Sequence, residues 1–527
     1  MTYSRLNASA ATLTKNRTED SVSPFSGMCT TCVDGCIGMC EIGKSAYRGP
    51  EMIYPQPFGI ITTASGKDYP VDLSHFTILG RATGAWGIAP DSDVALFPNV
   101  NLEVVFGRPP GIHSRLPFVL AALGSTNIAK NNWESLAVGS AISGTCLTVG
   151  ENVCGMDPQS NISDGRVLSS PELEWRVRTF REWQEDGYGE VIVQANVEDT
   201  MLGVHEYALT KLGVKAVELK WGQGAKDIGG EVKIRDLEKA RLLKQRGYVV
   251  LPDPDDPVVE EAFGRGSFRE FERHSRIGMA NRDAFLQRVE ELRKLGARWV
   301  FLKTGAYRPV DLARAVKWSS EAGIDLLTVD AAGGGTGMSP WRMMNEWGVP
   351  AIELHSLLRQ YCDTLAKRGD YVPPISIAGG FTFEDQIFKG LALVAPYARM
   401  ISWARGPLAA AMVGKTIGHR IEESNLPVYV ERFGTTVSEV FVTAPELQER
   451  FKDRFKKIPT GAIGLYTYYQ RVAQGLRQLM CGARKFSLEF ISRDDIAALT
   501  PEAASLSGIP MVMESDQEEA ERVLCGA

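Results

Sequence analysis

Between residues 133 and 404 the sequence alternates eight short β-prone runs with helical stretches, and this alternation constrains the fold more than any other feature. The runs are Ser135–Ile142, Glu190–Asn196, Ala216–Trp221, Tyr248–Pro252, Trp299–Thr304, Leu326–Asp330, Pro374–Ala378 and Arg399–Ala404. Eight strands alternating with helices over about 270 residues are typical of a (β/α)8 barrel. We therefore predict an α/β fold of this kind. A doubly wound sheet is the alternative, but no GxGxxG motif follows an early strand.

Two of the intervening stretches have the pattern of amphipathic helices. In Arg282–Leu295 the apolar residues Phe285, Val289 and Leu292 fall on one helical face. Pro309–Ala322 begins with a proline at a position that suits the first turn of a helix. Both stretches are predicted to be helices that cover the barrel.

The remainder of the chain divides into segments of different character. Residues 1–72 hold a polar start and a cysteine-rich segment, residues 73–132 are predicted to wrap the barrel as an α/β subdomain, and the barrel is predicted to span 133–420. Residues 421–527 are helical in pattern, with apolar and aromatic residues at helical spacing in Gly461–Met480. We expect this last region to cap the barrel.

Composition excludes several classes of protein. The 527 residues hold 58 Lys and Arg against 64 Asp and Glu, a formal net charge of −6, and 44% are hydrophobic. These proportions are those of a globular protein and exclude a disordered or fibrous chain. The slight acidity argues against a nucleic-acid partner. No apolar run approaches the roughly 20 residues that span a bilayer, so we predict a cytoplasmic protein without a membrane partner.

Four of the nine cysteines lie in one short run, CTTCVDGCIGMC. Cys29, Cys32, Cys36 and Cys40 have the close spacing that lets thiolates enclose a single metal centre. A [4Fe–4S] cluster is the favoured interpretation, because no histidine lies near and zinc sites more often consist of two separated CxxC pairs. A zinc site is the alternative.

Glycines and polar residues follow several predicted strands, where a barrel builds its active site. Lys303 is the only charged residue in its apolar strand, and a buried lysine is costly unless it meets an anion. Gly334 and Gly335, followed by Thr336, would let backbone N–H groups approach a phosphate. Gly379, Gly380 and Arg405 follow the last two predicted strands, the usual place of a barrel phosphate site. The structural alternatives are turn glycines and a lysine that extends to solvent.

These motifs together resemble the flavin domain of glutamate synthase over roughly residues 133–410. The family pattern QGAKPGEGG is similar to residues 223–230, and GGTGASP is similar to residues 334–340. Its SMSFG and NTGEGG patterns resemble residues 139–144 and 148–153. The presence of the first two patterns in this order and spacing makes the resemblance specific.

The resemblance implies an FMN-binding barrel that passes a hydride to the 2-imino acid formed from 2-oxoglutarate and ammonia or an amine. Lys303 would face the flavin, and Gln223 and Lys226 would line the ring or the substrate pocket as further catalytic residues. The cofactor-binding set would be Ser140, Gln223, Lys303, Gly334, Gly335, Thr336, Gly379, Gly380 and Arg405. Lys220, Lys226 and Glu151 would contact the substrate, whose carboxylates need cations.

The resemblance also implies an electron donor, either ferredoxin or a reductase subunit, and a homo-oligomer is compatible with it. The sequence departs from the family in two respects. The segment ahead of the barrel is too short for the family's glutaminase domain, and the three cluster cysteines that follow the family's last barrel strand are missing. The N-terminal cysteines would then replace them as the point of electron entry. Two alternatives are an FMN oxidoreductase acting on an unrelated small substrate and a flavin and iron–sulfur electron-transfer subunit.

Overall fold

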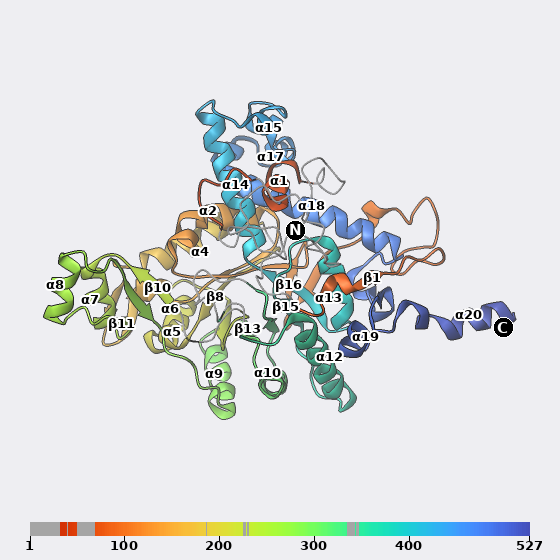
Figure 1. Ribbon diagram of the computed structural model, residues 1–527, viewed down its shortest axis with the longest axis horizontal. Helices are drawn as coiled ribbons and strands as arrows, with labels where there is room; N and C mark the ends of the chain where they lie inside the picture. The colour runs from red at the N-terminus through yellow and green to blue at the C-terminus, as the bar shows by residue number, and fades with distance from the viewer. Residues whose placement is uncertain are drawn as a thin grey trace.

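The centre of the molecule is a closed barrel of eight parallel strands surrounded by helices (Figure 1). The computed structural model describes residues 32–38, 40–49, 69–185, 187–224, 228, 231–334, 343 and 347–526. The predicted (β/α)8 fold is confirmed, and so is the helical character of the C-terminal region.

The barrel strands follow one another around the barrel in chain order. They are β4 (Phe118–Leu123), β5 (Cys146–Val149), β8 (Val191–Ala195), β9 (Ala216–Lys220), β13 (Trp299–Thr304), β14 (Leu326–Asp330), β15 (Ile375–Ala378) and β16 (Ala398–Trp403). The barrel closes where β16 pairs with β4, with Trp403 opposite Leu120. Because all neighbours are parallel, the carboxyl ends of all eight strands lie at one end of the barrel, which we call the mouth.

Helices connect the strands on the outside of the barrel. They are α2 (Asn127–Ile142), α4 (Pro171–Trp183), α5 (Val197–Leu202), α6 (Val204–Thr210), α9 (Arg282–Lys294), α10 (Pro309–Ala322), α12 (Ala351–Lys367), α13 (Glu384–Val394) and α14 (Arg405–Glu422). The predicted helices at 282–295 and 309–322 correspond to α9 and α10. A short helix, α3 (Val153–Met156), and a hairpin of β6 (Asn161–Ser163) and β7 (Arg166–Ser169) precede α4.

Two of the eight predicted barrel strands are wrong. Residues 135–142 form the second half of helix α2, and the first two barrel strands are instead β4 and β5, so the barrel begins before residue 133. Every residue of 135–142 is buried. A helix that is apolar all round loses the 3.6-residue periodicity that would identify it.

The second error concerns residues 248–252, which contain a strand that lies outside the barrel. This strand, β11 (Val249–Leu251), belongs to an antiparallel sheet with β10 (Glu231–Ile234) and β12 (Phe271–His274). With α7 (Leu237–Gln245) and α8 (Pro257–Gly264), the sheet forms an insertion between β9 and α9. Figure 1 shows the insertion projecting from one side of the barrel. The insertion has a separate apolar core that includes Tyr248 and Phe271.

The barrel interior is apolar at the end opposite the mouth. One buried cluster joins a side chain from each of seven barrel strands: Val119, Cys146, Ile192, Ala216, Phe301, Leu326 and Met400. A hairpin of β2 (Val104–Phe106) and β3 (Ile112–Ser114) adds Val104, Phe106 and Ile112 to the same cluster. The hairpin therefore closes this end, and only the mouth remains for a site.

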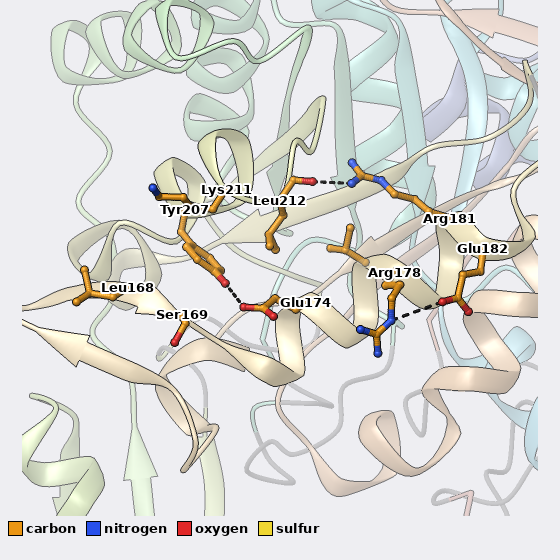
Figure 2. A pocket seen from close by; sticks show the side chains of 10 residues that line it. Leu168, Ser169, Glu174, Arg178, Arg181, Glu182, Tyr207, Lys211 and Leu212 are labelled. Atoms are coloured by element: carbon orange, nitrogen blue, oxygen red, sulfur yellow. Dashed lines mark hydrogen bonds and ion pairs between the residues drawn. The ribbon is translucent and has the colours of Figure 1, made fainter.

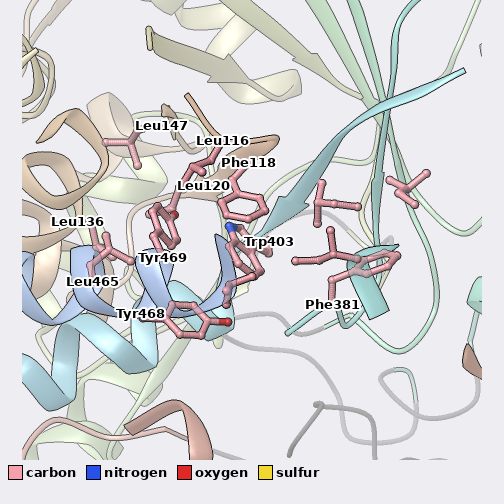
Figure 3. Close-up of a cluster of buried hydrophobic side chains, with 14 of the residues drawn as sticks. Leu116, Phe118, Leu120, Leu136, Leu147, Phe381, Trp403, Leu465, Tyr468 and Tyr469 are labelled. Carbon is pink, nitrogen blue, oxygen red and sulfur yellow. The ribbon is translucent and has the colours of Figure 1, made fainter. Parts of the chain in front are cut away.

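The C-terminal region packs one long helix, α18 (Thr460–Gly482), against α2 and α14. Figure 3 shows Tyr468 and Tyr469 of α18 beside Trp403 and Phe118. The rings of Trp403 and Tyr469 are stacked with centroids 5.5 Å apart. Helix α18 is thus an integral part of the barrel wall beside β16.

Smaller elements complete the described chain. They are α1 (Glu41–Arg48), η4 (Leu73–His75), β1 (Phe76–Ile78), η5 (Phe97–Asn99), α15 (Val428–Glu431), α16 (Val437–Val440), α17 (Ala444–Phe451), η6 (Lys452–Lys457), η7 (Leu488–Phe490), η8 (Arg493–Asp495), β17 (Ile496–Ala498), α19 (Pro501–Ser507), η9 (Val512–Glu514) and α20 (Gln517–Cys525). Strand β1 pairs antiparallel with β17, which ties the N-terminal segment to the C-terminal region. Within the described ranges no helix has both the length and the apolar character needed to cross a membrane.

Candidate active site at the barrel mouth

The barrel interior changes from apolar to polar toward the mouth. Side chains two residues apart on a strand point to the same face, so each residue two positions after the apolar cluster also faces inward. These next residues are mostly polar and all are buried: Thr148, Gln194, Glu218, Lys303, Thr328 and Ser402. Such a buried polar layer is costly unless its members bind one another or a ligand. The layer marks the mouth as the candidate active site.

Two ion pairs organise the charges of this layer. Lys303 Nζ lies 3.1 Å from Asp330 Oδ2, and both side chains are about nine-tenths buried. Lys220 Nζ lies 2.6 Å from Glu151 Oε1 and donates a hydrogen bond to Gln223 Oε1 at 3.2 Å. The structure therefore brings together four predicted site residues, with Lys303 close enough to act electrostatically on Glu151.

The shifted pKa values of the layer follow from burial and pairing. Burial acts to raise the pKa of Glu151, but pairing with Lys220 prevails and lowers it to about 2. Burial acts to lower the pKa of Lys303, but the charges of Asp330 and Glu218 prevail and raise it. Lys303 thus stays cationic at neutral pH. A buried permanent cation at the mouth is suited to stabilise an anion.

The loops that follow β14 and β15 approach each other through glycines. Gly379 has φ +131°, and a Cβ atom there would lie 2.8 Å from the Ala331 side chain. A Cβ atom on Gly380 would lie 3.3 Å from the carbonyl oxygen of Gly333, and one on Gly334 would lie 3.6 Å from the Cα of Gly379. At Gly379 both the positive φ and the short distance exclude a side chain. The two loops therefore present bare backbone beside the start of helix α14.

Arg405 is the first residue of helix α14 and directly follows the last barrel strand. Among the described residues, no side chain caps the amino end of α14. An uncapped helix start offers N–H donors and a positive dipole end to an anion. Since β15 and β16 are the seventh and eighth strands of the barrel, these loops occupy the predicted phosphate position.

A second buried network lies on the other side of the mouth. Asn152 adopts the left-handed conformation with φ 66°, and its backbone N–H donates to Asp199 Oδ2 at 2.8 Å. Asn152 Oδ1 accepts hydrogen bonds from Tyr248 and Ser275 of the insertion. Burial raises the pKa of Asp199 to about 7, and the nearby Glu151 charge adds to this effect. The network fixes the insertion to the mouth.

One predicted cofactor residue does not join this site. Ser140 lies inside helix α2, fully buried, and its carbonyl oxygen accepts hydrogen bonds from Thr145 immediately before β5. The amino end of β5 faces away from the mouth, so Ser140 sits at the opposite end of the barrel. Its assignment to the flavin site is therefore corrected. It followed from the resemblance of residues 139–144 to the SMSFG pattern of the family.

Four other predicted residues lie outside the described residues: Cys29, Lys226, Gly335 and Thr336. Conversely, the sequence reasoning missed Gln194, Glu218, Asp330 and Asp199 as members of the mouth. The signal for Gln194 and Glu218 was the same as that for Lys303, a polar residue inside an apolar strand. Asp199 has no comparable signal, because it is an N-terminal residue of α5 that the fold brings to Asn152.

The described part of the cysteine segment packs on the outside of the barrel wall. A Cβ atom on Gly38 would lie 2.7 Å from the Val413 side chain of α14, and Tyr429 donates to the Ile37 carbonyl at 3.4 Å. Cys36 Sγ accepts an N–H from Gly38 at 3.4 Å, and Cys40 Sγ accepts one from Gly43 at 3.5 Å. Among the described residues, no three His, Cys, Asp or Glu side chains form a metal-binding group.

One surface pocket lies away from the mouth. Figure 2 shows this surface pocket of about 700 Å³, which is lined by residues of α4 together with Tyr207 and Lys211. Its polar groups are engaged with one another, since Arg181 donates to the Leu212 carbonyl at 2.6 Å and Arg178 pairs with Glu182. None of the predicted site residues lines it, so it gives no reason to move the candidate site.

Comparison with known proteins identifies the region that carries the mouth. Residues 274–411 match the family model described as the conserved region in glutamate synthase. The chain is therefore similar to glutamate synthase over this region. The predicted resemblance is thereby confirmed. The matched region contains Lys303, Asp330 and Arg405, and also the glycines of the two neighbouring loops, Gly333, Gly334, Gly379 and Gly380. The Lys220–Gln223 segment lies ahead of it.

Individual proteins are similar over different lengths. The glutamate synthase large subunit-like protein YerD of Bacillus subtilis (strain 168) is 27% identical over 197 residues, which is 37% of this chain and 33% of the relative. The match thus spans about a third of the relative's length. The flavin-binding domain of baker's yeast flavocytochrome b2 has a TM-score of 0.46 and 13% identity, covering 85% of this chain and 81% of that chain. Mandelate oxidase with (S)-4-hydroxymandelic acid has a TM-score of 0.44 and 14% identity, covering 80% and 87%.

Proposed function

We propose that this chain is an FMN- and iron–sulfur-dependent oxidoreductase of the glutamate synthase type. It would transfer a hydride from reduced FMN to a 2-imino acid formed from 2-oxoglutarate and ammonia or an amine, giving glutamate or an N-substituted glutamate. The observation that carries the proposal is the buried layer around Lys303 at the mouth, because Lys303 and its partner Asp330 lie within the residues that match glutamate synthase.

The described residues fit FMN in three respects. The close glycine loops and the amino end of α14 with Arg405 would hold the phosphate. Lys303 would lie beside the flavin ring as a cation. Gln194 Oε1 is buried and accepts no hydrogen bond from the described chain, so it is an acceptor suited to a ring N–H. When bound, FMN supplies the hydride chemistry, while the protein orients and stabilises it.

Other groups of the chain would stabilise negative charge, bind the substrate carboxylates and exclude water. Lys303 would stabilise negative charge at the mouth because it remains protonated. Lys220 would orient a substrate carboxylate, in exchange for or alongside its contact with Glu151. Lys226, outside the described residues, is proposed as a second carboxylate partner. The insertion beside Asn152 would help to exclude water from the mouth.

The iron–sulfur part of the proposal rests on the four cysteines and on where three of them lie. Cys32, Cys36 and Cys40 are half-buried. The sulfurs of Cys36 and Cys40 accept hydrogen bonds from backbone N–H groups, and such bonds stabilise the thiolate form that binds a cluster. Tyr468, whose pKa is raised by burial and also by the nearby Cys40, donates to the Thr382 carbonyl at 2.5 Å. The cysteine segment is therefore near the loop after β15. Electrons would enter here from ferredoxin or a reductase subunit.

The test begins with anaerobically purified full-length protein, analysed for FMN, iron and zinc. We expect one flavin and a broad iron–sulfur absorbance. The dithionite-reduced protein should be reoxidised by 2-oxoglutarate with ammonia or methylamine, with glutamate or N-methylglutamate as product. Absence of flavin would refute the proposal. Bound flavin that neither mixture reoxidises would favour an unrelated substrate instead.

Cys36→Ala tests the cluster separately. We expect iron to be lost while flavin stays bound, because the cysteine segment lies outside the mouth. Cys481→Ala is the matched control, since Cys481 is also half-buried but lies at the end of α18. Unchanged iron in Cys36→Ala, or zinc in place of iron in the unmodified protein, would contradict the cluster assignment.

A further inference from the structure

The buried layer at the mouth holds more acids than bases among its described residues. Glu218 and Lys303 of the layer, together with their charged neighbours Glu151, Asp330 and Lys220, provide three carboxyl groups and two cations. With all five groups ionised the layer has a net charge of −1. In a buried environment such an excess charge is costly, so one carboxyl group is under pressure to carry a proton.

Of the three carboxyl groups, Glu218 is the one outside the two ion pairs. Glu151 is paired with Lys220 and Asp330 with Lys303, and among the described residues neither lysine donates a hydrogen bond to Glu218. Glu218 instead accepts a hydrogen bond from the neutral amide of Gln194, with 2.6 Å between Nε2 and Oε1. Glu218 is only 5% exposed, so water does little to solvate its charge.

The surroundings of Glu218 determine how it titrates. Lys303 of β13 and Lys220 of β9 favour its ionised form, whereas Glu151 after β5 opposes it, and Gln194 of β8 is neutral. His205 of α6 forms a hydrogen bond with the Glu218 backbone. Burial outweighs the two lysines and raises the pKa of Glu218. A further negative charge at the mouth would therefore favour the protonated form of Glu218.

We propose that Glu218 takes up one proton when FMN bound at the mouth is reduced to its anionic form, and releases that proton on reoxidation. This inference rests on the proposed function. Two electrons from the electron donor and one proton convert FMN to the reduced anion, and a second proton converts the Glu218 carboxylate to the acid. The layer and flavin together then keep the same net charge, −1, before and after reduction.

The released proton completes the balance of the proposed reaction. Hydride transfer to the carbon of a neutral C=N bond leaves the nitrogen one proton short of an amine. Reduced anionic flavin, protonated Glu218 and imine become oxidised flavin, ionised Glu218 and amine, with the same atoms and charge on both sides. Glu218 would therefore store this proton within the buried layer at the mouth.

The test measures how many protons accompany reduction. The midpoint potential of the FMN-loaded full chain is followed against pH from 6 to 9 with dithionite as reductant. In the wild type we expect a pH interval in which two protons accompany two electrons. In Glu218→Gln, which keeps the hydrogen-bonding shape but cannot ionise, we expect one proton per two electrons throughout.

Glu190→Gln is the matched control, because Glu190 is also a buried acid whose pKa is raised by burial. It lies before β8, at the end of the barrel opposite the mouth. This variant should keep the wild-type proton count. Infrared difference spectra provide a second readout, because a protonated-carboxyl band should appear on reduction in the wild type and in Glu190→Gln but not in Glu218→Gln.

The outcomes separate this inference from the proposed function. A wild type that shows one proton per two electrons at every pH, or a Glu218→Gln variant that keeps both the two-proton interval and the infrared band, would overturn the role of Glu218 alone. If Glu218→Gln fails to fold, the wild-type slope and infrared band still decide the question. If the expected results are obtained but no imino acid reoxidises the flavin, only the proposed substrate is wrong. A protein that binds no FMN would overturn both.

Discussion

Replacing Lys303 with methionine is expected to destabilise the protein strongly, because it removes one partner of a buried ion pair. At the observed 3.1 Å separation from Asp330 and an effective dielectric constant of about 20, the attraction is about 5 kcal/mol. Loss of one member of such a pair typically costs about 3–5 kcal/mol. We expect the free energy of unfolding of flavin-free Lys303→Met to fall by that amount. Urea denaturation of the flavin-free protein measures it without the stabilisation that a ligand adds.

The double variant Lys303→Met/Asp330→Asn separates the structural effect from the functional effect. It removes both charges of the pair, so much of the lost stability should return. The reduced flavin would still lack its cation, so the FMN midpoint potential should stay more negative than in the wild type. The potential is measured by spectroelectrochemical titration at constant pH.

Lys485→Met provides a matched control for both measurements. Lys485 and Asp495 form another buried pair, with 3.3 Å between Nζ and Oδ1, in the C-terminal region. Its loss should lower stability without shifting the flavin potential. The reasoning is refuted if Lys303→Met unfolds at the wild-type urea concentration, or if the double variant recovers the wild-type potential together with its stability.

Two further predictions concern the edges of the mouth. Gly379→Ala should weaken FMN binding, because the new Cβ would lie 2.8 Å from the side chain of Ala331. Equilibrium titration with FMN measures the affinity. The control is Gly369→Ala, where a Cβ meets nothing within 4 Å, and this variant should bind FMN normally. Ionisation of Asp199 costs the folded state, since its pKa is raised from 3.8 to about 7, so stability should fall as the pH rises from about 4 to 7. Asp199→Asn, which can still accept the Asn152 N–H, should abolish that part of the pH dependence in urea denaturation.

The sequence predicts the barrel through its repeated rhythm, but it does not predict every strand. Six of the eight predicted runs are barrel strands, because a parallel strand buried on both faces is a short apolar run between polar loops. Helix α2 is misread because it is buried on every side from Ser135 to Ile142. Strand β11 is read correctly as a strand, but local sequence carries no information on which sheet it joins.

The same limits explain the outcome for the site. Lys303 is predicted because an isolated charge in an apolar strand is costly, and the structure places it in the buried layer. Ser140 is misplaced because residues 139–144 resemble a family pattern but lie in helix α2. The pairing of Lys220 with Glu151 joins residues 69 positions apart, so it depends on the order of strands around the barrel and follows from no local pattern.

The position of the cysteine segment bears on the difference from glutamate synthase noted in the sequence. The family has its cluster cysteines after the last barrel strand; in this chain the corresponding residues 414–441 begin within helix α14 and contain no cysteine. Helix α1, which Cys40 caps, packs against α14 and α18, and Gly38 lies against Val413 of α14. A segment from the other end of the chain thus occupies the outside of the same helix. Because α14 begins at Arg405, beside the proposed phosphate site, a cluster here would lie on the same side of the barrel as one held after β16. This placement favours the interpretation that the cluster cysteines occupy a different part of the sequence in this chain but a similar place in the fold.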